Sequence, residues 1–284
     1  MDYSRQIESY IKEMPSLPVS VGKVLEICNN SSCNPSDLNK VISLDPVLTG
    51  RLLKLINSAY CGLSSHVTSL VKAITMLGIN TVKNLALSTA ILGTLPKNKE
   101  IDGLNMEGFW RHCLCVGVAS KLLAAKQGID PKYHQEYFTA GLLHDIGKIP
   151  LNAVLGEKYL KAVATADIEN KRLVIAENES MGINHCISGE MIAVMWKLDS
   201  PITDVIVWHH NINEYSGENL NIICTIAAAN HFSLAYELGF AGNRKPGKPG
   251  AIVWETIGLK DDVFEVFKDM VSQEIEKAKI FLNI

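Results

Sequence analysis

The sequence lacks the local signatures that most often identify nucleotide-binding proteins and serine hydrolases. Its 284 residues contain no G-x-x-x-x-G-K-[ST] phosphate loop, no G-x-G-x-x-G turn after a strand and no G-x-S-x-G segment around a nucleophilic serine. The reaction classes that depend on these motifs therefore lose their usual sequence support.

An excess of charge of one sign is also missing. There are 27 Lys and Arg against 30 Asp and Glu, a net charge of -3, with neither a polybasic block nor an acidic tail. A protein that binds nucleic acid non-specifically needs a concentrated basic face. Electrostatics gives no reason to expect such binding here.

Cysteine pairs and membrane-length apolar runs are absent from the sequence as well. The seven cysteines are odd in number and include no C-x-x-C pair, which argues against a disulfide framework or a zinc ribbon and for a reducing compartment. The N-terminus is too polar for a signal peptide. The longest uncharged stretch, 220–236, carries Asn221, Asn230 and Ser233, so it indicates a buried helix. We therefore expect a cytoplasmic protein that binds neither nucleic acid nor a membrane.

Apolar residues recur at helical spacing along almost the whole chain, which predicts an all-α fold with a sizeable core. Three helix starts are marked by a capping residue directly before proline, at Asn34, Asp45 and Ser200. Gly128 is expected to close a helix that begins near Met106.

The helices divide into two parts. Residues 1–95 predict five short helices that form an N-terminal layer; their ranges are about 2–13, 20–29, 35–43, 46–59 and 68–94, the last broken near Gly78. The polar stretch 96–103 is the predicted boundary. The second part, 104–284, ends in an amphipathic helix over 261–282 that is expected to pack back on this part. Before that helix, the basic Gly- and Pro-rich loop 241–250 is interpreted as a connector, although its cations could also contact phosphates.

Histidines concentrate in the second part, beside apolar helical segments. Burying an imidazole without a partner costs free energy, so a shared explanation is needed for the five that lie there, and metal ligation supplies one. These five are His112, His144, His185, His209 and His210. We interpret the other three, His66, His134 and His231, as structural or surface residues.

The segment Gly141-Leu-Leu-His-Asp-Ile-Gly-Lys148 places Asp145 directly after His144 at a helix end. Imidazole with carboxylate suits iron, manganese or zinc, and an open coordination position would let bound water act as a nucleophile. Lys148 could bring an ammonium to an anionic oxygen in the same cleft. The neighbours His209 and His210 diverge by about 100 degrees on a regular helix. Both can face one ion only if the helix frays there.

These segments resemble the HDOD branch of the HD superfamily, the HD-related output domains of bacterial signalling. The resemblance covers about residues 14–230 and is carried by both parts of the chain. Its segments are Met14-Pro-Ser-Leu-Pro18, Asp45 to Tyr60, Ser69 to Gly78, Phe109-Trp-Arg-His112, Gly141 to Lys148, and Trp208-His-His210. It implies an HDOD-type bundle, in which an N-terminal helical layer packs on an HD-domain-like bundle.

The resemblance also implies a set of metal ligands and one departure from it. The implied ligands are His112, His144, a bridging Asp145, His185, His209 and His210. Asn230 stands where the family's enzymes have a closing aspartate. A neutral amide leaves Asp145 as the one carboxylate, and two divalent ions would bring +4 against that single negative charge. We therefore expect at most one ion, and we expect His112, His144, Asp145 and Asn230 to converge in space.

Three functions remain open at this point. We choose a non-catalytic signalling output module that contacts another protein and whose pocket binds a metal or a small ligand. The alternative is a metal-dependent phosphohydrolase acting on a nucleotide second messenger, with Asp145 and Lys148 as catalytic residues. A third is a metal or redox sensor, because Cys113 and Cys186 neighbour implied ligands. Input and output are expected to come from separate proteins, and residues 1–95 to contribute no catalytic group.

Overall fold

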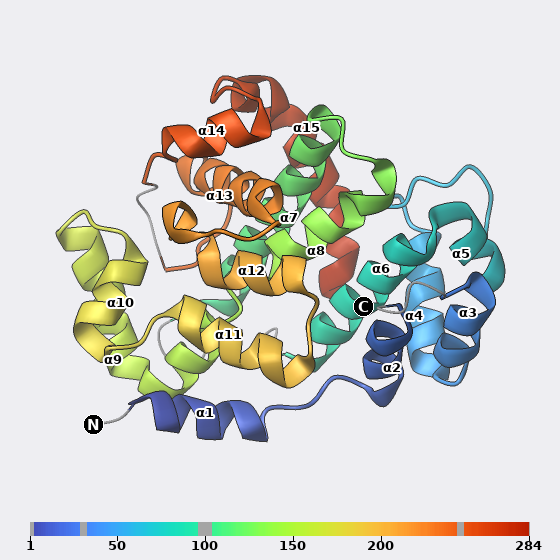
Figure 1. Cartoon of the computed structure of the whole chain (residues 1–284), viewed down its shortest axis with the longest axis horizontal. Helices are drawn as coiled ribbons and strands as arrows, with labels where there is room; N and C mark the ends of the chain where they lie inside the picture. Colours follow the sequence, from blue (N-terminus) through green and yellow to red (C-terminus); the bar gives the residue numbers. More distant parts are fainter. Residues whose placement is uncertain (1–2, 29–32, 96–103, 243–246, 284) are drawn as a thin grey trace.

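The computed structural model describes residues 3–28, 33–95, 104–242 and 247–283 (Figure 1). Within these ranges all secondary-structure elements are helices, which confirms the all-α fold. The first part of the chain forms α1 (Tyr3–Glu13), α2 (Val19–Cys28), α3 (Pro35–Ser43), α4 (Pro46–Ile56), α5 (Leu70–Leu77) and α6 (Ile79–Thr94). The second part forms α7 (Met106–Lys126), α8 (His134–Leu143), α9 (Lys148–Ile168), α10 (Leu173–Met181), α11 (His185–Trp196), α12 (Ser200–Trp208), α13 (Leu220–Ala235), α14 (Ala251–Ile257) and α15 (Val263–Ala278). Short 3-10 helices are η1 (Pro131–Tyr133), η2 (Ile212–Glu214) and η3 (Lys279–Asn283).

Two of the three predicted helix caps are confirmed, and the third is wrong. The side chains of Asn34 and Asp45 each accept a hydrogen bond of 2.9 Å from a backbone N–H in the first turn of their helix. Ser200, in contrast, already belongs to α12, and Asp199 takes the cap position. The Asp199 carboxylate does not cap the helix, because it pairs with the ammonium of Lys83 on α6 at 2.6 Å.

Several predicted boundaries shift slightly. The helix over 68–94 is two helices, because Gly78 adopts a φ of 85° that breaks it, as expected. The helix over 46–59 ends at Ile56. At the C-terminus, α15 packs on α7, and its continuation η3 crosses to α6. The boundary stretch 96–103 and part of the loop 241–250 lie outside the described residues.

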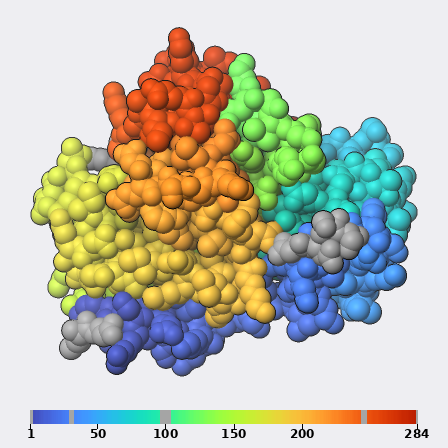
Figure 2. Space-filling model, in the orientation of Figure 1, coloured from blue at the N-terminus to red at the C-terminus, as the bar shows by residue number. Residues whose placement is uncertain are grey.

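Helix α6 joins the two parts of the molecule. It is buried along almost its whole length and contacts α2, α4 and α5 on one side and α8 on the other. By contrast, α1 leaves the N-terminal layer that the sequence predicts and lies against α9 and α11. Figures 1 and 2 show it along the edge of the second part, away from α3, α4 and α5. Helices α1 and α6 therefore contact the second part at two separate places.

The second part is built around the close approach of α7 and α8. A Cβ atom on Gly141 would lie 2.9 Å from the Cα of Gly117, so the two backbones touch where these glycines face each other. This contact holds His112 on α7 near His144, the residue after α8. None of the described helices combines the length and apolar character that crossing a membrane requires.

Candidate metal centre

Four segments of the second part bring the sequence-predicted histidine and aspartate ligands together in a buried cluster. His112 lies on α7, Asp145 in the turn after α8, His185 at the start of α11, and His209 at the end of α12. One group of potential ligand atoms joins Asp145 with His185, His209 and His210, and a second joins Asp145 with His112 and His144. The expected convergence of residues far apart in the sequence is therefore present.

The Asp145 carboxylate lies between the two groups of histidines. Its Oδ2 atom lies 3.3 Å from Nε2 of His144 and 3.6 Å from Nε2 of His112. Its Oδ1 atom lies 3.4 Å from Nε2 of His185 and 3.7 Å from Nε2 of His209. Each carboxylate oxygen thus faces a different pair of imidazoles, which is the placement that a bridging carboxylate needs.

The four imidazoles are oriented by hydrogen bonds at the ring nitrogen that faces away from Asp145. Their Nδ1 atoms contact Ser233 Oγ for His112 (3.0 Å), Gly141 O for His144 (2.7 Å), Glu177 Oε2 for His185 (2.6 Å) and Val205 O for His209 (2.9 Å). The Nε2 atoms of all four are buried and have no hydrogen-bond partner in the described structure. Metal-ligating histidines characteristically donate their other N–H in this way. The donor set therefore fits a divalent metal ion.

Glu177 is a functional residue that the sequence reasoning missed. Its side chain is fully buried on α10, and one carboxylate oxygen accepts hydrogen bonds from the backbone N–H of His185 at 3.0 Å and from its Nδ1. The available signal was the carboxylate that directly follows the apolar run 173–176 of α10, eight residues before His185. Glu177 fixes the orientation and tautomer of that imidazole.

Burial and neighbouring charges shift the pKa values of the cluster in opposite directions. Burial alone would raise the pKa of Asp145, but His144, Lys148 and His185 hold it well below its usual range. Burial lowers the pKa of His112 to about 3 and that of His209 well below its usual value. Burial would lower the pKa of His185 too, but the Glu177 carboxylate raises it to about 10. The cluster thus combines a carboxylate with mostly neutral imidazoles.

The remaining predicted residues are placed as follows. Helix α12 ends at Trp208, so the backbone leaves the helix at His209 and lets His210 reach the same group, as expected. Asn230 on α13 is buried beside His112, and its Oδ1 atom has no hydrogen-bond partner among the described residues. Lys148 directs its ammonium to Asp145 Oδ2 at 2.7 Å and to the carbonyl of Ala241 at 2.9 Å, and is itself buried. The anionic oxygen that it meets in this structure belongs to the protein.

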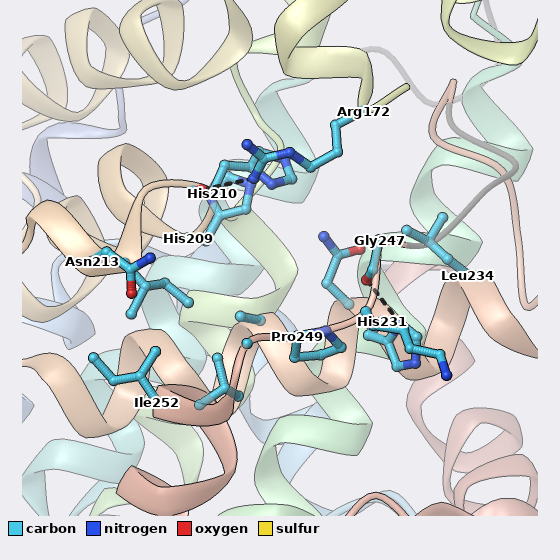
Figure 3. A pocket seen from close by; sticks show the side chains of 15 residues that line it. Arg172, His209, His210, Asn213, His231, Leu234, Gly247, Pro249 and Ile252 are labelled. Atoms are coloured by element: carbon cyan, nitrogen blue, oxygen red, sulfur yellow. Dashed lines mark hydrogen bonds between the residues drawn. The ribbon is translucent and has the colours of Figure 1, made fainter. Parts of the chain in front are cut away.

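A pocket of about 180 Å³ opens beside the cluster (Figure 3). His209, His210 and Asn230 line its inner end, and Arg172 and Lys248 also line it. Arg172 donates a hydrogen bond of 3.0 Å to the carbonyl of His210. The pocket therefore connects the candidate metal ligands with the surface.

The structure also shows the surroundings of two histidines interpreted as structural or surface residues, His134 and His231, and of Cys113, which was considered for a sensor role. His134 contacts the carbonyl of Ile129 at 2.7 Å, which is a local structural role. His231 lines the pocket and contacts the carbonyl of Gly247 at 3.1 Å, so its position adds to the site. Burial raises the pKa of Cys113 well above its usual value, and a thiol kept protonated in this way is a poor redox sensor.

The chain is similar to known proteins over most of its length. A family model described as HDOD domain matches residues 14–212, more than half of the chain. A protein from Treponema pallidum (strain Nichols) is 25% identical over 224 residues, which make up 79% of this chain and 43% of that protein. The chain therefore spans less than half the length of this relative.

Solved structures share the fold. An HDOD domain protein from Geobacter sulfurreducens is 23% identical with a TM-score of 0.76, covering 98% of this chain and 96% of that one. A proposed phosphohydrolase from Shewanella amazonensis SB2B is 22% identical with a TM-score of 0.71, covering 97% of each chain. At these identities the likeness shows a common fold.

Proposed function

Because this chain belongs to the HDOD domain family, we propose that it is a non-catalytic signal-transduction module that acts through protein contacts and binds one divalent metal ion in its buried cluster. The charge around Asp145 is the observation that carries this proposal. Asp145 is the only carboxylate in the two ligand groups of the described residues. Its charge is already offset by the Lys148 ammonium at 2.7 Å.

The residues that would hold the ion are Asp145 and the histidines whose Nε2 atoms face it. A bound iron, manganese or zinc ion would supply positive charge and Lewis acidity at this point. The protein itself orients four imidazoles through hydrogen bonds at their Nδ1 atoms. Its neighbouring positive groups keep Asp145 ionised. Asn230, in place of an acid, adds an oxygen but no negative charge. A site with so little negative charge favours one weakly held ion over two.

Exposed apolar side chains on the N-terminal layer support a role in protein contacts. Val19 and Leu44 expose 76% and 77% of their surface and line the same shallow depression between α2 and α3, and Val47 beside it exposes 63%. Contiguous exposed apolar residues commonly mark protein interaction sites. No group of the metal cluster comes from the described residues before 95, in line with a division of labour between the two parts.

The alternative, a metal-dependent phosphohydrolase acting on a nucleotide second messenger, is favoured by one observation. The pocket reaches His209 and His210, so a small molecule has a path to the cluster. Against it stands Lys148, whose ammonium is buried and bonded to Asp145 and Ala241. That ammonium would have to leave both partners before it could contact a phosphate.

Metal content and turnover, measured on the same preparation, test the proposal. We expect at most one iron, manganese or zinc ion per chain by elemental analysis of protein purified without a chelator. We also expect no hydrolysis of mononucleotides or cyclic dinucleotides. Asn230→Asp should tighten metal binding, and Asp145→Asn should abolish it. Turnover of roughly 1 per second or more that disappears in Asp145→Asn would contradict the proposal and establish the phosphohydrolase.

A further inference from the structure

Two hollows adjoin each other on helix α2. Val19, Lys23 and Leu44 line the first, which lies between α2 and the connection from α3 to α4. Val19, Lys23, Glu26 and Lys197 line the second, which lies between α2 and the end of α11. Because Val19 and Lys23 line both, these five residues share one continuous surface, which we call the α2 face. In Figure 1, α2 lies between α3 and the end of α11.

Gly22 leaves a gap in the middle of the α2 face. It follows Val19 by three residues and precedes Glu26 by four, so the three lie on one side of the helix. Glycine destabilises an exposed helix relative to alanine. A Cβ atom at Gly22 would have no neighbouring atom within 4 Å, so the packing of the described chain does not require glycine here. Its missing side chain lets the backbone of another molecule approach α2 closely.

The α2 face combines exposed apolar side chains with charges of both signs. Val19 and Leu44 expose 76% and 77% of their surface. Lys23, Glu26 and Lys197 are also exposed, and none of the three forms an ion pair in the described part of the chain. A partner with charges of one sign would be repelled by part of this face. An identical face related by a two-fold axis would not, because each residue of one copy can meet a different residue of the other.

We infer that the α2 face is the contact surface of a two-fold symmetric dimer of this chain. Gly22 lets the two copies approach closely, and Glu26 of each copy pairs with a lysine of the other. Covering Val19 and Leu44 removes apolar surface from water and so favours association. None of the candidate metal ligands lines either hollow, so each copy keeps a complete cluster. The inference rests on the proposed function in one respect, because it names a second copy as a partner of the surface assigned there to protein contacts.

Sedimentation equilibrium over a series of protein concentrations tests the dimer. We expect a reversible equilibrium between monomer and dimer. Val19→Asp and Leu44→Asp should each raise the dissociation constant about tenfold or more, because each places a charge in the apolar part of the contact. Val266→Asp is the matched control, since Val266 on α15 is 78% exposed and lines neither hollow. This variant should dimerise as the unaltered protein does.

Gly22→Gln separates the contact between copies from the stability of the fold. Glutamine favours a helix more than glycine does, so the midpoint of urea denaturation should not fall. The longer side chain keeps the two copies apart, so the dissociation constant should rise about tenfold or more. A dimer that forms unchanged in both Gly22→Gln and Val19→Asp would use a different surface and would overturn the inference.

Charge reversal tests the pairing between copies. Glu26→Lys leaves only positive charges among Lys23, Lys197 and position 26, and the double variant K23E/K197E leaves only negative ones. Each variant alone should therefore stay monomeric, because like charges meet across the two-fold axis. An equimolar mixture of the two should form a mixed dimer. A mixture that stays monomeric would contradict the charge pairing and overturn the inference.

Metal content and turnover, measured on the same samples, let the two proposals fail separately. Unaltered protein that stays monomeric at every concentration, with one ion and no turnover, would overturn the dimer alone and leave the α2 face to a different protein. A dimer that behaves as expected, together with turnover that is lost in Asp145→Asn, would support the dimer and contradict the proposed function.

Discussion

Helices α1 to α5 and the helices from α7 to α13 bury different kinds of side chain. Every buried residue of α1 to α5 is apolar. From α7 onward the core also contains titratable groups that touch one another, above all His112, Asp145, Glu177 and His185. Buried polar groups cost free energy unless they are paired. The first region is thus built for packing, and the second gives up stability to hold a chemical site.

The comparison is sharpest at Glu177, where a buried carboxylate orients His185. Replacing it by alanine should lower the free energy of unfolding by roughly 3–5 kcal/mol, because the buried backbone N–H and Nδ1–H of His185 are both left without an acceptor. Metal binding should weaken as well, since the imidazole loses its anchor. Chemical denaturation and metal titration measure the two effects.

The control for this prediction lies on the same helix. Glu179 is exposed and pairs with Lys171 at the surface, and exposed pairs contribute less than about 1 kcal/mol. Glu179→Ala should therefore be nearly silent in both measurements. If Glu177→Ala and Glu179→Ala lowered the free energy of unfolding and metal binding equally, the buried carboxylate would contribute no more than an exposed one, and the prediction would be wrong.

The apolar region should respond in stability only. Leu52 on α4 is fully buried, and Leu52→Ala should cost roughly 3 kcal/mol through lost burial and a cavity. The metal stoichiometry of the folded protein should stay the same, because no ligand comes from this region. Leu44→Ala, at a residue 77% exposed, should cost below about 0.5 kcal/mol. A loss of metal in folded Leu52→Ala protein would contradict the division between the regions.

The ion pair between Lys83 on α6 and Asp199, the residue before α12, joins the first part of the chain to the second. The two groups lie 2.6 Å apart, with side chains 10% and 9% exposed. A double-mutant cycle with Lys83→Met and Asp199→Asn should give a coupling energy of roughly 1–2 kcal/mol. The exposed pair Lys277 and Glu274, also at 2.6 Å, should show coupling near zero. Equal coupling energies in the two pairs would mean that the buried pair of Lys83 and Asp199 contributes no more to stability than a surface ion pair does.

Sequence reasoning succeeded where the signal was local or carried by a motif. The caps at Asn34 and Asp45 were predictable because the capping residue and its proline are adjacent in the sequence. The cluster around Asp145 was predictable from the order of the histidines and the family resemblance. Helix α1 was misplaced because an amphipathic pattern shows that one face is buried and does not show against which helix.

Contacts between distant residues could not be read from the sequence. Lys148 was expected to meet an external anion, yet one of its acceptors is the carbonyl of Ala241, 93 positions away. Glu177 could be recognised as part of the site only from the structure, in which the turn between α10 and α11 places its carboxylate against Nδ1 of His185. The pocket cations Arg172 and Lys248 come from separate loops. The role of a buried polar group can be predicted only when its hydrogen-bond partner is known, and these partners lie far away in the sequence.

The smallest expected effect concerns Asp45, the capping residue of α4 in the apolar region. Its carboxylate accepts hydrogen bonds from the backbone N–H of Leu48 at 2.9 Å and from Ser20 Oγ at 2.7 Å, and these bonds lower its pKa below the usual value. Asp45→Ala should cost about 1 kcal/mol at neutral pH. Because the folded pKa is the lower one, the ionic part of this contribution is present above about pH 4 and is lost as the pH falls further.

Asp45→Asn separates the charge of this cap from its hydrogen bond, because asparagine caps a helix as well as aspartate does and does not titrate. Denaturation at pH 7 and near pH 3 should show the cost of Asp45→Ala, measured against the unaltered protein, shrinking at the acid end. Its cost measured against Asp45→Asn should stay constant. A cost against the unaltered protein that is equal at both pH values would mean that the carboxylate caps α4 by its hydrogen bonds alone. The apolar region would then contain no charge that contributes to its stability through this cap, and the contrast with the second region would become sharper.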